Sequence, residues 1–201
     1  MSPIEFIHQH FIHDRRVRRL SEWFAGWLPP GSSVLDVGTG DGRLARAILD
    51  LRPGLTLQGL ETAPRVGCAI PVRPFDGCSL PVGDRSVDVV LFCDVLHHAD
   101  DPLALLREAA RVARAFVLIK DHLREGWLAQ ATLRFMDDTG NRRHGVPIPA
   151  NYLNTREWTV AFADAGLRLV HRETRLRLYP IPFDWWFGRS LHFLARLEPI
   201  R

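Results

Sequence analysis

A strand, a glycine-rich turn and a helix follow one another over residues 34–50, and this succession constrains the fold more than any other stretch. An apolar run ends at Asp36, glycine then stands at positions 38, 40 and 42, and apolar residues recur at helical spacing from Arg43 onward. Glycine is needed where φ is positive or where the backbone lies against a ligand, and the N–H groups that open a helix face that ligand. The pattern predicts a nucleotide-like ligand at the end of a first parallel strand.

The glycine spacing narrows the class of ligand. The dinucleotide fingerprint G-x-G-x-x-G needs a glycine at position 43, where Arg43 stands, and no Gly-Lys-Ser/Thr follows to complete a Walker phosphate loop. The pattern that remains, D-x-G-x-G-x-G after a first strand, resembles motif I of the class I S-adenosylmethionine-dependent methyltransferases. Within them the sequence is most similar to the small type 11 group, and the resemblance covers residues 30–122.

A second motif supports the same resemblance. The run from Val87 to Phe92 is almost continuously apolar, which is typical of a central parallel strand covered on both faces. Two histidines follow it, and Asp101-Pro102 opens a helix that we expect to end at Val112. Four short motifs in this region resemble the type 11 group: V-D-V-V at 87–90, V-L-H-H at 95–98, D-P at 101–102 and E-x-x-R-V at 108–112. Val87 stands where the group usually has phenylalanine.

The resemblance implies an α/β Rossmann-like fold with a seven-stranded mixed sheet, strand order 3-2-1-4-5-7-6, strand seven antiparallel and helices on both faces. We expect the strands at residues 34–37, 55–60, 70–73, 87–92, 115–120, 167–179 and 190–197. Between strands two and three, Pro64 and Gly67 interrupt a segment that is too short for a full crossover helix, so a turn is predicted there. Thr155 is expected to cap a helix that ends at Phe162, without a full capping box.

One domain is predicted for residues 1–201, since 201 residues with 46% hydrophobic side chains can bury a sizeable core. We divide it into a helical N-terminal cover (1–30), a cofactor-binding half (31–122), an acceptor-side insertion (123–154) and a C-terminal helix with a β-hairpin (155–201). The insertion is expected to be helical over 123–136 and a loop over 137–149. In the resembled family a leading helix of this kind often covers the cofactor and could act as a partial lid.

Charge and composition exclude several classes of partner. The net charge is only +3, and Arg15, Arg16, Arg18 and Arg19 favour a solvated helix face over nucleic-acid binding, because no aromatic stacking platform accompanies them. No apolar stretch reaches the roughly 18 residues of a membrane span and no signal peptide is recognisable, so we expect a cytoplasmic protein without stable membrane insertion, either monomer or homodimer. The 3 cysteines form no C-x-x-C pair, which disfavours a disulfide framework and structural zinc.

The resemblance implies S-adenosyl-L-methionine as cofactor and assigns residues to it one by one. Glu61 follows the second strand, where a carboxylate can accept hydrogen bonds from both ribose hydroxyls. The stretch from Asp76 to Pro81 resembles the family's D-x-x-x-L-P segment, in which the acid accepts from the adenine amino group. The cofactor-binding residues so implied are Asp36, Gly38, Thr39, Gly40, Gly42, Glu61, Thr62, Asp76, Gly77, Cys93 and Asp94.

Methyl transfer from a sulfonium is an in-line displacement, so the protein must align the nucleophile and remove its proton if it carries one. Histidine is the side chain whose ordinary pKa suits that task near neutral pH. His97 or His98 is predicted to be the base or an acceptor-orienting group, with Asp121 and His122 as partners and His144 as a weaker candidate. A metal site is not predicted, since Asp94, Asp121 and His122 show no ligand spacing on one element.

The sequence therefore predicts a methyltransferase that acts on an oxygen, nitrogen or carbon nucleophile of a small-molecule acceptor. RNA or protein methylation, lipid or quinone methylation, and a non-enzymatic cofactor-binding subunit remain alternatives. Trp185, Trp186 and Phe187 could contact lipid or an apolar acceptor, but we favour core packing at the bend of the hairpin.

Overall fold

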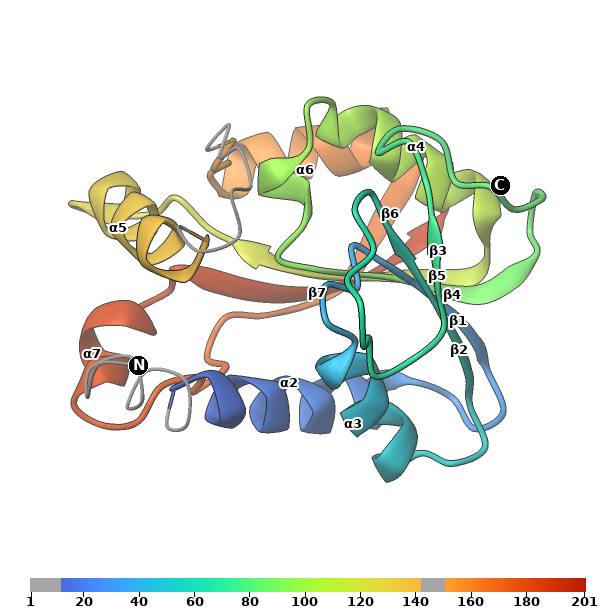
Figure 1. The fold of residues 1–201 in the computed structure, drawn as a ribbon. Coiled ribbons are helices and arrows are strands. Elements are labelled where there is room, and N and C mark those ends of the chain that lie inside the picture. The colour runs from blue at the N-terminus through green and yellow to red at the C-terminus, as the bar shows by residue number, and fades with distance from the viewer. Residues whose placement is uncertain (1–11, 142–150) are drawn as a thin grey trace.

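The computed structural model describes residues 12–141 and 151–201, and its sheet has seven strands in the order β3-β2-β1-β4-β5-β7-β6 (Figure 1). β7 pairs antiparallel with β5 and β6, and the other neighbours pair in parallel. The predicted fold class is thus confirmed. The strands are β1 Ser33–Val37, β2 Thr56–Glu61, β3 Val72–Pro74, β4 Val87–Cys93, β5 Ala113–His122, β6 Leu167–Glu173 and β7 His192–Pro199.

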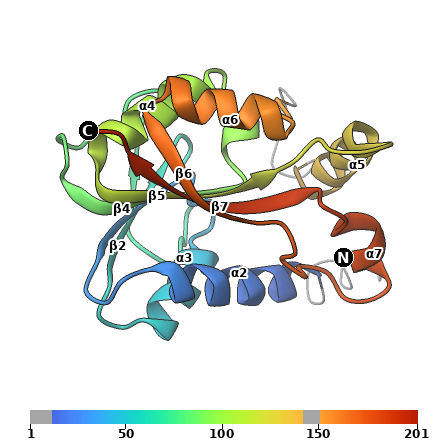
Figure 2. The same cartoon turned by 180° about the vertical axis from the view of Figure 1, so that it is seen from behind.

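Helices cover both faces of the sheet. α2 (Asp14–Trp27) and α3 (Arg43–Leu51) lie on one face, and α4 (Pro102–Val112) and α6 (Thr155–Asp164) lie on the other (Figures 1 and 2). A short 3-10 helix, η2 (Leu96–His98), follows β4. α5 (Ala129–Asn141) and α7 (Phe183–Phe187) lie together at one end of the sheet, beyond the last residue of β5 and the first of β7. No helix in the described ranges is long and apolar enough to cross a bilayer.

The continuously apolar sequence of β4 is explained by its burial on both faces of the sheet. Val89 and Leu91 are buried in the core cluster on the side of α2 and α3, whereas Val90 and Phe92 are buried in the cluster on the side of α4 and α6. Successive side chains of a strand point to opposite faces, so a strand covered on both faces needs apolar residues at every position. β1 pairs with β4 and ends beside it, which brings the glycine turn and η2 to the same edge of the sheet.

Four strands begin or end two or more residues away from where they were predicted. β6 ends at Glu173 rather than at Tyr179, because Leu176, Leu178 and Tyr179 leave the sheet and are buried in the core on the side of α2. β3 begins two residues later than expected, β5 extends to His122, and β7 begins at His192. The turn that was predicted in place of a helix between β2 and β3 is confirmed.

The secondary structure of two stretches, one aromatic and one rich in charged residues, was predicted wrongly. The stretch 180–186, expected to be loop, contains most of α7, and Trp185 and Trp186 are exposed rather than packed in the core; only Phe187 is partly buried against it. The loop expected over 137–149 begins later, since Asp137 and Asp138 belong to α5. Residues 142–150 of that stretch lie outside the described residues, as do residues 1–11 of the predicted N-terminal cover.

α6 begins with a full capping box, which corrects the prediction for Thr155. Asn154 is the N-cap: its Oδ1 accepts from the N–H of Glu157 at 2.9 Å, and Glu157 Oε2 accepts from the N–H of Asn154 at 2.7 Å. Glu157 is also held by Arg124, whose Nη2 lies 2.9 Å from Oε2. The first turn of α6 is therefore fixed to the segment that follows β5.

The capping box predicts the outcome of two neighbouring substitutions. Asn154→Ala should lower the free energy of unfolding by about 1 kcal/mol, because it leaves an N–H of the first turn without its acceptor. Thr155→Ala is the matched control and should change it by less than about 0.5 kcal/mol. Urea denaturation followed by circular dichroism measures both, and a larger loss for Thr155→Ala than for Asn154→Ala would contradict the assignment of the cap.

Candidate active site

The glycine turn is held between β2 and the segment that follows β4. Its glycines have φ values of 73°, 62° and 75° at positions 38, 40 and 42. The N–H groups of Gly38 and Thr39 both donate to the carbonyl oxygen of Leu60, at 2.8 and 3.1 Å. A Cβ at Gly38 would lie 2.5 Å from Val95 Cγ2, whereas a Cβ at Gly40 would meet nothing within 4 Å. Gly38 is thus required by packing, and the backbone at Gly40 borders open space.

The predicted ribose and adenine residues lie beside this turn. Glu61 Oε2 accepts from the N–H of Gly40 and Oε1 from the N–H of Thr62, each at 2.9 Å, so the carboxylate joins the turn to the end of β2. Gly77 approaches Thr62 so closely that a Cβ there would lie 3.3 Å from Thr62 Cγ2. Asp76 Oδ1 accepts from two backbone N–H groups of its own turn, which lower the pKa of Asp76. These predicted cofactor residues therefore share one rim of the sheet.

Asp36 is a buried carboxyl beneath the turn. Thr39 Oγ1 donates to its Oδ2 at 2.5 Å, and burial raises the pKa of Asp36 to about 6. Cys93, on the neighbouring strand, is partly buried, and burial also raises the pKa of its thiol. A cation close to this carboxyl would stabilise its ionised form.

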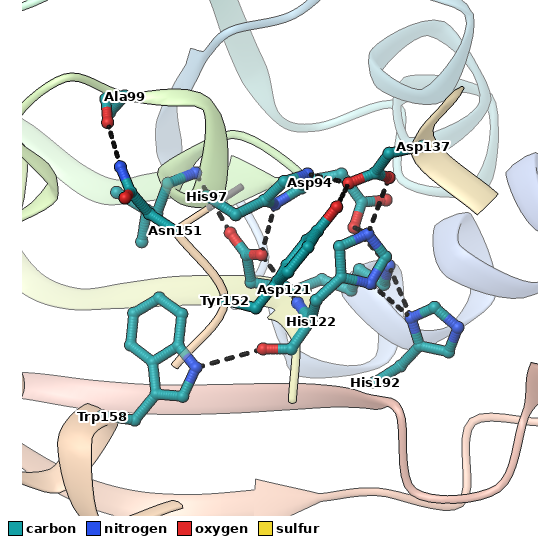
Figure 3. A network of polar contacts seen from close by, with 12 residues as sticks. Asp94, His97, Ala99, Asp121, His122, Asp137, Asn151, Tyr152, Trp158 and His192 are labelled. Carbon is teal, nitrogen blue, oxygen red and sulfur yellow. Dashed lines mark hydrogen bonds and ion pairs between the residues drawn. The ribbon is translucent and has the colours of Figure 1, made fainter. Parts of the chain in front are cut away.

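Asp121 is the centre of a second group of polar residues at the same edge (Figure 3). Its Oδ1 lies 2.6 Å from His97 Nδ1 and accepts from the N–H of His122 at 2.6 Å, while Oδ2 accepts from the N–H of Leu96 at 3.0 Å. The side chains of Asp121 and His97 are both buried. This carboxylate thus ties η2 to the end of β5 and fixes the orientation of the His97 ring.

His97 lies between two carboxylates. Its Nε2 is 3.4 Å from Asp137 Oδ2, within ion-pair distance, while Nδ1 faces Asp121. Burial by itself would lower the pKa of His97, but the negative charges of Asp121 and Asp137 outweigh burial and raise it. His97 is therefore suited to carry a positive charge near neutral pH.

Asp137 and Tyr152 enter the site from the insertion. The Tyr152 hydroxyl donates to Asp137 Oδ2, and His122 Nε2 lies 3.3 Å from Asp137 Oδ1. Burial by itself would raise the pKa of Asp137, but His122, His97 and the Tyr152 hydroxyl lower it to about 2. Asn151 holds the segment before Tyr152 against η2, since its Nδ2 donates to the Ala99 carbonyl at 3.0 Å.

The antiparallel pairing of β5 and β7 adds His192 to the group. His122 and His192 are register partners, and their Nδ1 atoms lie 3.2 Å apart. Lys120 Nζ and the Tyr179 hydroxyl each lie 3.3 Å from a nitrogen of His192. Burial and the Lys120 charge lower the pKa of His192 well below its usual range, and burial and the His97 charge lower that of His122. Both rings are thus neutral near neutral pH.

Asp94 lies beside the histidines, with its Oδ1 3.9 Å from His122 Nε2. Its carboxylate contacts the buried Lys120 ammonium and accepts from Arg16 Nη2 at 2.7 Å. Burial by itself would raise the pKa of Asp94, but Lys120 and Arg16 hold it well below its usual range. Since Arg16 belongs to α2, this ion pair connects the helical cover to the site. The cofactor-binding role of Asp94 stays a prediction.

His98 is the more accessible histidine of η2. Its ring centroid lies 4.0 Å from that of His97, and its side chain is only partly buried. Burial and the positive charge of His97 both lower the pKa of His98. The described part of the site thus pairs a buried histidine whose pKa is raised with a less buried one whose pKa is lowered.

The same residues form two groups that resemble ligand sets for a metal ion. The donor atoms of Asp94, His97 and His122 lie within 4.8 Å of one another, and so do those of His97, His98 and Asp137. In both groups, however, the carboxylates already contact cationic or hydroxyl partners. The absence of a metal stays a prediction.

The structure brings together most of the predicted site residues and adds others. His97, His98, Asp121 and His122 form one group, whereas His144 lies outside the described residues. Arg16 was expected on a solvated helix face and instead pairs with Asp94, so that prediction was wrong for this residue. Residues that the sequence analysis did not select are Lys120, Asp137, Tyr152, Tyr179 and His192. Lys120 carried a usable signal, since it directly precedes Asp121 at the end of a predicted strand, and Asp137 and Tyr152 lie in the insertion that was expected on the acceptor side.

Comparisons with known proteins settle the family. A family model described as "Methyltransferase domain" matches residues 7–172, which is most of the chain. The chain belongs to this family. The predicted resemblance to class I S-adenosylmethionine-dependent methyltransferases is therefore confirmed.

Individual relatives share part of their length or a small share of identical residues with this chain. An uncharacterized methyltransferase of Mycobacterium sp. (strain KMS) is 41% identical over 93 residues, which cover 43% of this chain and 36% of that protein, so the chain spans about a third of that relative's length. The ubiquinone biosynthesis O-methyltransferase of Parvibaculum lavamentivorans is 24% identical over 83% of this chain and 71% of its own length. The Haloferax volcanii methyltransferase solved with the Trm112 activator shares the fold, with a TM-score of 0.73 and 20% identity over 98% of this chain and 93% of that chain.

The buried carboxyl beneath the glycine turn predicts a dependence of stability on pH. Because the folded pKa of Asp36 is raised to about 6, its contribution to stability is present below the unfolded pKa of about 4 and is lost as the pH rises through about 6. Asp36→Asn should remove this loss, which is on the order of 3 kcal/mol at pH 7. Unfolding in urea at a series of pH values measures the difference between variant and wild type.

Asp50→Asn, on the exposed end of α3, is the control and should leave the loss of stability caused by Asp36 in place. Parallel curves for Asp36→Asn and the wild type between pH 4 and pH 7 would show that Asp36 is not desolvated.

Proposed function

We propose that this protein is an S-adenosylmethionine-dependent methyltransferase that methylates a hydroxyl group of a small molecule. The observation that carries the proposal is the pairing of a buried Asp121–His97–Asp137 network with the neutral His98 at the edge of the sheet that also bears the glycine turn. A base that is not already protonated is needed where the nucleophile carries a proton. The printed name of the Parvibaculum relative, an O-methyltransferase, is consistent with a hydroxyl acceptor.

The residues of the glycine turn fit the cofactor of this family. The open backbone at Gly40 allows close approach of a ligand, and the Glu61 carboxylate beside it can accept from a ribose diol. Asp76 and Gly77 would contact the adenine, and the buried Asp36 would balance the ammonium group of the methionine part. When bound, this cofactor supplies a methyl group attached to a positively charged sulfur.

His98 is the residue that we assign as general base. Its lowered pKa keeps the imidazole neutral near neutral pH, so that it can accept the proton of an acceptor hydroxyl. His97 is unsuited to this role, because Asp121 and Asp137 favour its protonated form. His122 is neutral but buried, and its nitrogens already face His192 and Asp137. We assign His97 and Asp121 as positioning residues that hold η2, and hence His98, in place.

The remaining segments fit the predicted division of the chain. Residues 31–122 would hold the cofactor, and the insertion would form the acceptor side, since Asp137 and Tyr152 reach the histidines from it. α2 would act as the cover, because Arg16 contacts Asp94 at the site.

The assignment of the cofactor residues predicts the affinity for S-adenosylhomocysteine. Glu61→Gln should weaken binding by about tenfold to a hundredfold, because the amide can no longer serve as a charged acceptor for the ribose hydroxyls. Isothermal titration calorimetry with the purified protein measures the affinity. Glu22→Gln, an exposed side chain on α2, is the control and should bind as the wild type does. Saturable binding that is equal in Glu61→Gln and the wild type would refute the assignment.

The assignment of His98 predicts a pH profile. Formation of S-adenosylhomocysteine with a panel of phenols and alcohols should fall as the pH drops through a pKa below 6.5, since His98 is then protonated. His98→Asn should lower kcat by about a hundredfold or more and abolish this acidic limb. His171→Asn, on the exposed surface of β6, should leave rate and profile unchanged. An acidic limb that persists in His98→Asn would assign the base to another group.

A further inference from the structure

Exposed aromatic side chains are concentrated at one end of the molecule. Of the 13 large hydrophobic residues exposed in the described ranges, 7 lie in two short stretches at residues 127–135 and 181–186. All five exposed aromatic residues are among them, with Trp127 82%, Trp185 73% and Trp186 56% exposed. Singly scattered apolar residues are ordinary on a protein surface, but a concentration of tryptophan marks an interaction site.

The two stretches form one surface. Arg189 Nη2 donates to the Trp127 carbonyl at 3.4 Å, and its guanidinium lies 5.2 Å from the centre of the Trp186 ring. Phe135 of α5 and Phe187 of α7 stack with ring centres 6.4 Å apart. α5 and α7 also lie at the same end of the sheet in both views (Figures 1 and 2). We name this the aromatic surface and define it as Trp127, Leu128, Phe135, Ile181, Phe183, Trp185 and Trp186.

The aromatic surface lies on the segments that build the active site. α5 exposes Phe135 and buries Asp137, which contacts His122. The segment around α7 is flanked by Tyr179 and His192, which contact each other inside the molecule. A molecule held against the outer side of these helices would therefore be separated from the histidines by one layer of secondary structure.

The side chains of this surface match the interface of a lipid bilayer. Tryptophan is enriched where apolar chains meet polar headgroups, because its ring is apolar and its N–H is polar. Arg189 supplies a cation beside Trp186 and makes no ion pair with a carboxylate in the described ranges. On α5, Arg134 and Asp138 are both exposed and their charges offset each other. Asp184, the acid within α7, is turned inward, since its Oδ1 accepts from the Tyr179 N–H at 3.1 Å. Aromatic side chains with arginine suit a surface that contains anionic headgroups.

We propose that the aromatic surface docks onto a lipid bilayer and that the methyl acceptor is an apolar molecule carried by that bilayer. The docking stands on the exposed side chains alone. The second statement rests on the proposed function, because it identifies the class of molecule that reaches His98.

Flotation with vesicles tests the docking. The whole protein should float with vesicles of phosphatidylcholine, and more strongly when they contain phosphatidylglycerol, with the added binding removed by salt. Trp185→Ser/Trp186→Ser should lower the partition coefficient by on the order of tenfold. Val160→Ser/Val170→Ser, two exposed apolar residues on α6 and β6, is the matched control and should bind as the wild type does. Brominated phosphatidylcholine should quench the tryptophan fluorescence of the bound protein.

Other outcomes would overturn the proposal. Equal flotation of the tryptophan variant and the wild type, or no flotation of either, would exclude docking through this surface. A wild type that is dimeric by light scattering, does not float, and becomes monomeric in the tryptophan variant would show that the surface pairs two copies of the chain.

Titration with S-adenosylhomocysteine separates this inference from the proposed function. The tryptophan variant should bind it as the wild type does, because the aromatic surface lies outside the predicted cofactor residues. Flotation without any binding of S-adenosylhomocysteine would leave the docking in place and refute the proposed enzyme. Binding without flotation would refute the docking alone. Methylation of a long-chain phenol in vesicles, but not of its short-chain analogue in solution, would support the apolar acceptor.

Discussion

The buried carboxylate of Asp121 is the interaction on which the rest of the site depends. A carboxylate without partners inside a protein is strongly unfavourable, so its oxygens must be matched by donors. Here two backbone N–H groups, of Leu96 and His122, and the His97 ring meet that need. The same bonds attach the 3-10 helix after β4 to the end of β5. The placement of both η2 histidines thus follows from satisfying one buried charge.

Charge balance explains the protonation of the surrounding histidines. Asp94, Asp121 and Asp137 face three cationic groups, Arg16, Lys120 and His97. Once these charges are matched, a further buried cation is disfavoured both by desolvation and by repulsion from the first three, which is why His98, His122 and His192 have lowered pKa values. The opposite pKa shifts of His97 and His98 are therefore a property of the whole network. The same insertion that supplies Asp137 also carries part of the aromatic surface, so the proposed acceptor side and the proposed docking surface share one segment.

Much of the fold was readable from local pattern. The glycine spacing after Asp36 reflects the positive φ values of the turn. The continuous apolar run of β4 reflects burial on both faces of the sheet. Both features depend on residues that are neighbours in the sequence. Histidines directly after strand ends could be predicted to meet, because parallel strands end at one edge. The cap of α6 was missed by one residue, since Asn154 and Thr155 are both capable caps and only the bonds to Glu157 distinguish them.

The sequence by itself determined the family, the order of the strands and the edge of the sheet at which the candidate site lies. Only the tertiary structure decided that Asp137, Tyr152, His192 and Arg16 join that site, because they come from separate elements whose approach depends on long-range packing and on the register of β5 with β7. It likewise decided that Trp185 and Trp186 are exposed. The sequence shows that aromatic side chains are present in this stretch. Which of them the core can bury depends on how the neighbouring elements pack.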